Sequence, residues 1–155
     1  MKEMGLFELS DVARIVGIPE WKAKNWTVGR PLQITPSLRG GKGRGSLNLY
    51  STADIYLMAL AKEMYDGGLS SGAINSLIKK LEGKSLQDAE KPLMFFYLQA
   101  EQAVVEFVSQ DWLKTKGSWL STRADNKPLV VTLIRLQALS RRINKRIEEF
   151  KKTGK

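Results

Sequence analysis

Proline and glycine interrupt this 155-residue chain between residues 29 and 45, and no regular helix can run through that segment. It holds two prolines and five glycines. Proline lacks the backbone N–H that a helix needs for its hydrogen bonds. Glycine loses more conformational entropy than other residues when it becomes part of a helix. The segment predicts a loop over residues 39–45 between short strands at 32–34 and 47–49. The chain on either side must form separate elements.

Two short helices are predicted before this loop. Ser10 is a favourable N-cap for a helix over residues 11–16, and Gly17 is a favourable stop after it. Pro19 then begins a second helix over 19–28, because proline fits the first helical turn. Two helices separated by two residues are a helix-turn-helix candidate, although many helical proteins contain such a pair.

Two further helices are predicted after the loop. Ser51, with Asp54 three residues later, predicts a capping box at the start of a helix that runs to about residue 66. This helix has apolar residues nearly all round, as a buried central helix should. Gly67 and Gly68 end it. Ser70 or Ser71 caps the next helix, which is apolar on one face: Ile74, Leu77, Ile78 and Leu81.

The C-terminal half has a different pattern. Residues 93–98 and 103–108 are short, aromatic and β-branched, which favours a hairpin, while one long helix over 92–113 remains an alternative. A short helix over 111–120, a strand over 128–134 and an amphipathic helix with a basic outer side follow. The predicted fold class is α+β. An N-terminal winged helix-turn-helix (1–82), mostly α with a small β wing, and a linker (83–91) precede a small β-β-α-β-α domain (92–155).

The charge of the chain favours a polyanionic partner. The formal net charge is +9 and the pI is about 9.8, which favours nucleic acid first and an anionic membrane surface or an acidic protein second. Between residues 22 and 44 there is no acidic side chain, whereas a solvated face usually mixes both signs. The basic residues there are Lys22, Lys24, Arg30, Arg39, Lys42 and Arg44.

Several functional classes lack the residues they need. The chain has no cysteine and no histidine, which removes disulfides, the usual zinc and haem ligands and the commonest general base. The Gly-Lys-Gly of the loop lacks the spacing of a phosphate-binding P-loop. We therefore expect no enzyme activity and no cofactor. With no signal-like leader and no long apolar run, we expect a cytoplasmic protein that does not enter a membrane.

The second helix, over residues 19–28, has two different sides. Ala23 and Trp26 fall on one side and predict a core contact, while Trp21, Lys24 and Asn25 fall on the other. A lysine can bond guanine O6 and N7 or a phosphate, and an asparagine can bond adenine N6 and N7. The opposite side therefore suits a DNA major groove. Trp21 is equally consistent with a partly buried core position.

The order of these residues resembles the DNA-binding domain of MerR-type regulators over about half of the chain. The resemblance rests on the run Leu-Ser-Asp-Val-Ala-Arg-Ile-Val-Gly-Ile at 9–18, on Trp26, Tyr50-Ser51, Asp54-Ile55, Gly68-Leu69-Ser70 and Ile74. It implies a winged helix-turn-helix that binds double-stranded DNA as a homodimer on a pseudo-palindromic operator, in the bacterial cytoplasm and associated with the nucleoid. It also implies a C-terminal part that dimerises or senses an effector.

Carried over by position, the resemblance assigns base contacts to the helix and phosphate contacts to the wing loop. Three positions depart from the family pattern: Lys24 stands where Arg is usual, Asn25 where Tyr is usual, and Asn48 where a wing arginine is expected. These departures bear on the operator sequence rather than on the fold. The predicted DNA-binding residues are Arg14, Trp21, Lys22, Lys24, Asn25, Arg39, Lys42 and Arg44.

Two other functions fit the same residues. One is an architectural or excisionase-like protein that bends DNA with this fold, and the other is a basic module that binds a protein or RNA. A small-molecule effector has no direct support. Phe95, Phe96 and Tyr97 with Trp112 and Trp119 could line a ligand pocket, but core packing is the commoner use of such residues.

Overall fold

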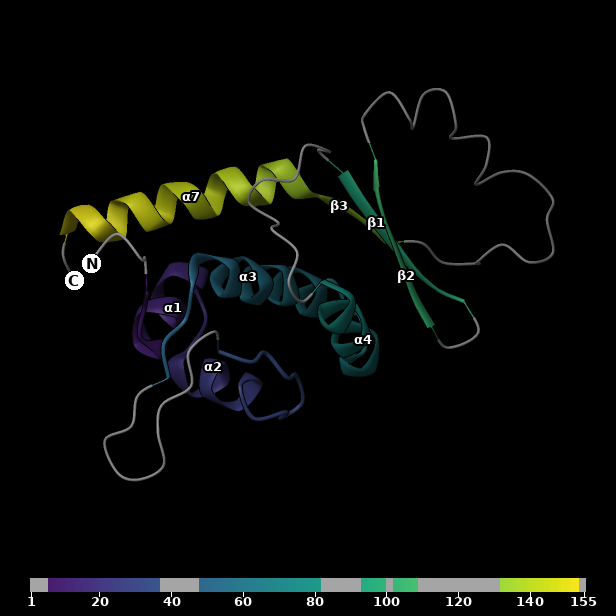
Figure 1. The fold of residues 1–155 in the computed structure, drawn as a ribbon, viewed down its shortest axis with the longest axis horizontal. Helices are drawn as coiled ribbons and strands as arrows, with labels where there is room; N and C mark the ends of the chain where they lie inside the picture. The colour runs from purple at the N-terminus through teal and green to yellow at the C-terminus, as the bar shows by residue number, and fades with distance from the viewer. Residues whose placement is uncertain (1–5, 37–47, 82–92, 100–101, 109–131, 154–155) are drawn as a thin grey trace.

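The computed structural model describes residues 6–36, 48–81, 93–99, 102–108 and 132–153. Four helices come first, three strands follow, and a long helix ends the described part (Figure 1). The helices of the first half are α1 (Leu9–Val16), α2 (Glu20–Trp26), α3 (Thr52–Asp66) and α4 (Ser71–Leu81). The second half holds β1 (Leu93–Gln99), β2 (Gln102–Val108), β3 (Thr132–Arg135) and α7 (Leu136–Thr153).

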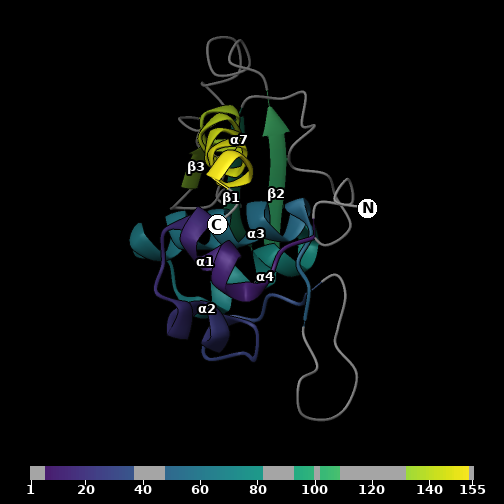
Figure 2. The same ribbon diagram turned by 90° about the vertical axis from the view of Figure 1, so that its left-hand side faces the viewer.

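Helix α3 is the centre of the molecule. Every residue from Asp54 to Ala61 is buried, and α3 packs against α1, α4 and α7. Figures 1 and 2 show α2 and α7 on opposite sides of the layer that α1 and α3 form. Helix α2 therefore has one side on the core and one side free at an end of the molecule.

The turn between α1 and α2 forms as predicted at its glycine. Gly17 has a left-handed φ of 86°, and its N–H donates to the Ala13 carbonyl at 2.8 Å. The predicted start was wrong, because the N-cap is Glu8 and Ser10 lies inside the helix. The Glu8 N–H donates to the Asp11 carboxylate at 3.2 Å, and Leu9 packs against the core. Partial burial of Leu9 favours a helix that begins nearer the N-terminus.

Replacing Gly17 with alanine should lower the free energy of unfolding by about 1–2 kcal/mol, because a Cβ is unfavourable at positive φ. The added Cβ would also lie 3.2 Å from Nη1 of Arg146. Gly72 is the matched control, since it lies in α4 with no heavy atom near an added Cβ. Gly72→Ala should raise stability by about 0.5 kcal/mol. Urea unfolding measures both, and equal effects would contradict the strain argument.

Helix α2 is shorter than the predicted range of 19–28. Pro19 is the N-cap, with an extended ψ of 144°, and its carbonyl accepts from the N–H groups of Lys22 and Ala23. Trp26 is the last helical residue and Thr27 is the C-cap. Pro19 is therefore the N-cap rather than the first residue of the helix, because its fixed φ also suits the residue that precedes a helix.

The capping box of α3 is confirmed. The Ser51 N–H donates to the Asp54 carboxylate at 2.9 Å, and the Asp54 N–H donates to Ser51 Oγ at 3.2 Å. Asp54 is buried, and the bond from the Ser51 N–H gives its carboxylate a partner inside the fold. At the other helix, Ser70 Oγ accepts from the Ala73 N–H at 3.2 Å, which makes Ser70 the residue that caps α4.

The strand predicted at 32–34 does not form. Leu32 and Ile34 are fully buried, but the segment has no regular secondary structure. The Gln33 N–H donates to Asn75 Oδ1 and the Ile34 N–H donates to the Trp26 carbonyl, so neither N–H is free for a partner strand. Near the strand predicted at 47–49, Tyr50 forms an isolated antiparallel bridge with Phe7. The wing loop, 39–45, lies outside the described residues.

The second half forms a three-stranded antiparallel sheet in the order β2-β1-β3. Strands β1 and β2 pair as a hairpin, with Met94 opposite Phe107, so this segment is not a single long helix. Met94 also pairs with Ile134 of β3 and is fully buried. The helix predicted over 111–120 lies outside the described residues, and the complete β-β-α-β-α order stays a prediction.

Helix α7 runs from the sheet back to the first helices (Figure 1). Leu139, Ile143 and Ile147 are buried, and the helix packs against both α1 and α3. The Tyr56 hydroxyl of α3 donates to the Asn144 side chain of α7. The last helix therefore shares one hydrophobic core with the helix-turn-helix. No helix of the described residues has the length and apolarity to cross a bilayer.

Candidate nucleic-acid interface

The outward side of α2 carries an unusual set of exposed residues. Trp21 is 66% exposed and Val28, just past the helix end, is 57% exposed. Lys24 is exposed and Asn25 is partly exposed between them. The alternative that Trp21 is a core residue is therefore wrong. Tryptophan is enriched at interfaces because it combines a large apolar ring with a hydrogen-bonding N–H, so this side of α2 is a candidate binding surface.

The inward side of α2 fixes the helix to the core. Ala23 is fully buried and Trp26 is 1% exposed, as predicted. The Trp26 ring lies against Tyr65 of α3, with ring centroids 5.7 Å apart. Lys22 lies on this flank as well, because its Nζ is 4.5 Å from the Tyr65 ring centroid and 5.4 Å from that of Trp26. The structure does not bring Lys22 onto the outward face.

Hydrogen bonds hold the chain that follows α2. The Arg30 N–H donates to the Asn25 carbonyl at 2.9 Å. The Asn75 side chain of α4 donates to the Pro31 carbonyl at 2.9 Å and accepts from the Gln33 N–H at 2.9 Å. Sequence reasoning missed Asn75, because a polar residue on an amphipathic helix gives no signal for so distant a contact. Its amide positions the exit from the candidate recognition helix.

Tyr50 connects the segment that follows α2 with the start of α3. It is 1% exposed, and burial raises the pKa of its hydroxyl, as does the negative charge of Asp54. Side-chain hydrogen bonds with Thr27 and Asn48 lower that pKa, without cancelling the rise. Thr27 in turn donates to the Lys24 carbonyl at 2.7 Å. Tyr50 is thus a buried framework residue at the end of α2.

We expect Tyr50→Phe to change the alkaline stability of the fold. The raised pKa means that the unfolded chain ionises first, so the contribution of Tyr50 is present below about pH 10 and falls as pH rises through the folded pKa. At pH 7 the removal of its hydrogen bonds should cost about 1 kcal/mol. Urea unfolding of both proteins from pH 7 to 11 should show the gap between them narrowing. Two parallel curves would contradict this assignment.

Arg14, a predicted DNA contact, lies on the side of α1 that contacts helix α7. Its Cζ is 5.9 Å from the ring centroid of Phe150 in α7. Beside it, Nη1 of Arg146 donates to the carbonyls of Ile15 and Val16, each at 3.1 Å. An arginine of α7 thus satisfies carbonyls at the end of α1, where a helix leaves them without partners. The structure brings together Trp21, Lys24 and Asn25, but not Arg14.

The three predicted wing contacts, Arg39, Lys42 and Arg44, lie outside the described residues. Lys24 and Arg30, which precede them in the chain, are exposed. Among the described residues, no group of three acidic, cysteine or histidine side chains could hold a metal ion. The chemistry of the described face is therefore hydrogen bonding, positive charge and aromatic contact.

Part of the chain is similar to proteins described as helix-turn-helix transcriptional regulators. The chain is 30% identical over 82 residues to an uncharacterized HTH-type transcriptional regulator of Mycobacterium bovis, a match over 53% of this chain and 36% of that protein. Uncharacterized HTH-type transcriptional regulators of Mycobacterium tuberculosis match to the same extent. The chain thus spans about a third of the length of these curated relatives, at 36%. No protein-family model matches it.

Proposed function

We propose that this protein is a transcriptional regulator of the MerR type that binds specific sequences of duplex DNA as a homodimer in the bacterial cytoplasm. In this proposal, residues 19–28 enter the major groove and the wing loop, 39–45, lies on the phosphate backbone. One observation carries the proposal. Helix α2 exposes Trp21 and Lys24 while Trp26, on the same short helix, is 1% exposed.

The residue types on this face match the chemistry of base recognition. Lys24 can donate to guanine O6 and N7, and Asn25 can pair with both adenine N6 and N7. Trp21 and Val28 can contact thymine methyl groups or sugars, because each presents apolar surface to solvent. A helix that is held on its inner side presents these groups in fixed positions, and such rigidity favours sequence discrimination over general affinity.

The wing and the flanking cations supply affinity in this proposal. Arg39, Lys42 and Arg44 are placed there by the sequence, where the glycines let the backbone approach a phosphodiester chain. Lys22 flanks the base-reading face rather than belonging to it, so we assign it to a phosphate. Arg14 lies against Phe150 of α7, away from that face, and has no role in this proposal. Each phosphate contact releases counterions, and the affinity should fall as salt rises.

Selection of preferred sites from random duplexes tests the proposal directly. A regulator of this kind should enrich one motif with two related half-sites, and half-site spacing of about one helical turn would also report the homodimer. Sedimentation of the selected complex gives the stoichiometry independently. Enrichment of no motif, with strong bending of all duplexes, would contradict sequence-specific regulation and favour an architectural DNA-bending protein.

We expect the triple variant Arg39→Ala, Lys42→Ala and Arg44→Ala to weaken binding to every duplex rather than to alter the preferred sequence. The slope of log affinity against log salt should become shallower by about 0.9 for each phosphate that the variant no longer neutralises. Fluorescence anisotropy at several salt concentrations measures the slope. Lys79→Ala, at an exposed lysine of α4 rather than of the loop, is the control. An unchanged slope in the triple variant would remove the wing from the interface.

A further inference from the structure

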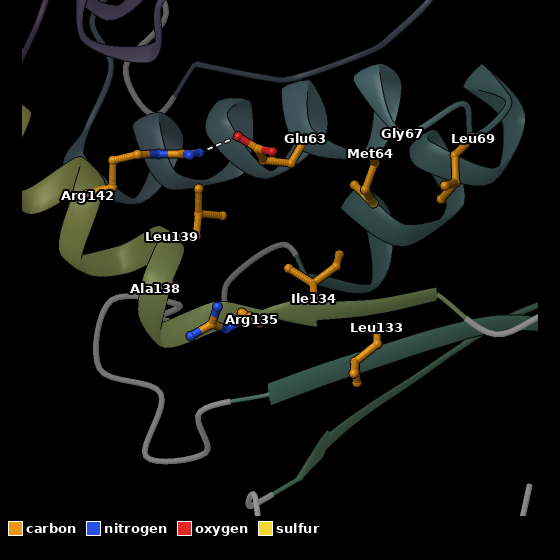
Figure 3. Close-up of a pocket in the computed structure, with 10 residues that line it drawn as sticks. All are labelled: Glu63, Met64, Gly67, Leu69, Leu133, Ile134, Arg135, Ala138, Leu139 and Arg142. Carbon is orange, nitrogen blue, oxygen red and sulfur yellow. Dashed lines mark hydrogen bonds and ion pairs between the residues drawn. The ribbon is translucent and has the colours of Figure 1, made fainter.

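A pocket of about 560 Å³ opens between the end of α3, strand β3 and the first turns of α7 (Figure 3). Its volume is in the range that holds a small organic molecule. It is separate from α2 and from the candidate DNA-binding face, and the proposed function does not use it.

The wall of the pocket includes several apolar side chains. Met64 and Leu139 are buried in it, at 2% and 6% exposure, and Leu69 is partly buried beside them. Leu133 of β3 is 47% exposed at the same pocket, which leaves apolar surface in contact with water. Covering that surface would be favourable for any ligand that has an apolar body.

The described lining of the pocket carries more positive than negative charge. Two arginines and one glutamate line it, and Glu63 is already paired with Arg142. Arg135 has no ion pair with any residue that the structure describes, and it is exposed at the junction of β3 and α7. A guanidinium can hold a carboxylate through two parallel hydrogen bonds. The pocket therefore combines apolar surface with one positive charge that no described residue neutralises.

We propose that this pocket binds an amphipathic organic anion, a carboxylate carried on a short apolar chain or ring. Arg135 holds the carboxylate, and Met64, Leu69, Ile134 and Leu139 hold the apolar body. The inference goes beyond DNA binding and does not depend on it. A ligand there would contact α7, the same helix whose Arg146 bonds the end of α1.

The test measures binding of three probes to the full chain by calorimetry, without DNA. Octanoate should bind with a stoichiometry of one, octanol should bind at least tenfold more weakly, and acetate should not bind. Arg135→Gln should weaken octanoate binding at least tenfold, and Ala138→Phe should abolish it by filling the pocket. Arg141→Gln, on the same helix but not in the lining, should change it less than twofold.

Several results would overturn the proposal. These are the absence of octanoate binding to the wild type, equal binding by the Arg135 and Arg141 variants, or unchanged binding when Ala138→Phe fills the pocket. Circular dichroism of each variant identifies any loss of fold, in which case Ala138→Leu replaces the phenylalanine variant. If octanoate does not bind and Ala138→Phe converts a dimer to a monomer, the pocket is filled by a second copy of the chain. Failure to select a DNA site would leave the calorimetry unaffected, so the two proposals fail separately.

Discussion

Replacing Lys24 and Asn25 together with alanine is expected to remove most of the sequence preference of this protein for its selected site. Each well-placed interaction with a base edge is worth about 1–3 kcal/mol of discrimination, so removing two of them reduces the specific-to-random affinity ratio by one to several orders of magnitude. Both side chains lie on the outward side of α2, so truncation leaves the core packing of this helix unchanged. The fold should remain intact.

The measurement compares the selected duplex with a scrambled duplex at one salt concentration for wild type and variant. Lys80→Ala in α4 is the matched control, because it removes the same charge from another exposed position. The control should keep the affinity ratio, and the double variant should bind both duplexes with nearly equal affinity. A double variant that still prefers the selected duplex to the wild-type extent would show that another surface recognises the bases.

Local patterns explain why much of the first half could be predicted from the sequence. The Ser51 and Asp54 capping box and the apolar run after it defined α3, because capping and burial act over a few neighbouring residues. Gly17 defined the end of α1 through the left-handed conformation that glycine adopts at little cost. The burial of Ala23 and Trp26 followed from helical periodicity alone, and so did the outward side that carries the proposed function.

Long-range contacts explain what could not be predicted. Arg146 bonds the carbonyl of Ile15, which lies 131 positions earlier in the chain. The Asn75 side chain accepts a hydrogen bond from the Gln33 N–H, and a strand at 32–34 would need that N–H to pair with its neighbour. Neither contact leaves a local pattern, because each residue alone resembles a solvated polar side chain. The missing strand at 32–34 and the packing of α7 against α1 therefore depend on tertiary structure that short-range rules do not contain.

The placement of α7 connects the pocket with the first helices of the chain. One end of this helix lines the pocket with Ala138 and Leu139, and the other end bonds α1 through Arg146. Helix α1 packs directly on α2, which carries the outward residues. The pocket and the candidate recognition helix are thus connected through two packed helices. Allosteric regulation needs such a two-site arrangement, in which a ligand at one site changes the affinity of the other.

The two tryptophans of α2 should respond in opposite ways to the same substitution. Trp26→Ala is expected to lower the free energy of unfolding by about 3–5 kcal/mol, because it removes a large buried side chain and leaves a cavity under α2. Small domains have only about 5–15 kcal/mol in total, so this variant should be partly unfolded near physiological temperature. The truncation also removes the ring that packs on Tyr65.

Trp21→Ala is the matched counterpart, since Trp21 lies on the same helix but is 66% exposed. Its free energy of unfolding should stay within about 0.5 kcal/mol of the wild type, whereas its affinity for the selected duplex should fall. Thermal unfolding and anisotropy titration, run on both variants, separate stability from binding. Equal destabilisation of the two variants would mean that Trp21 contributes to the core in solution. The outward side of α2 would then present no aromatic side chain that could contact DNA. Normal stability of Trp21→Ala together with weakened DNA binding would assign that side chain to the interface.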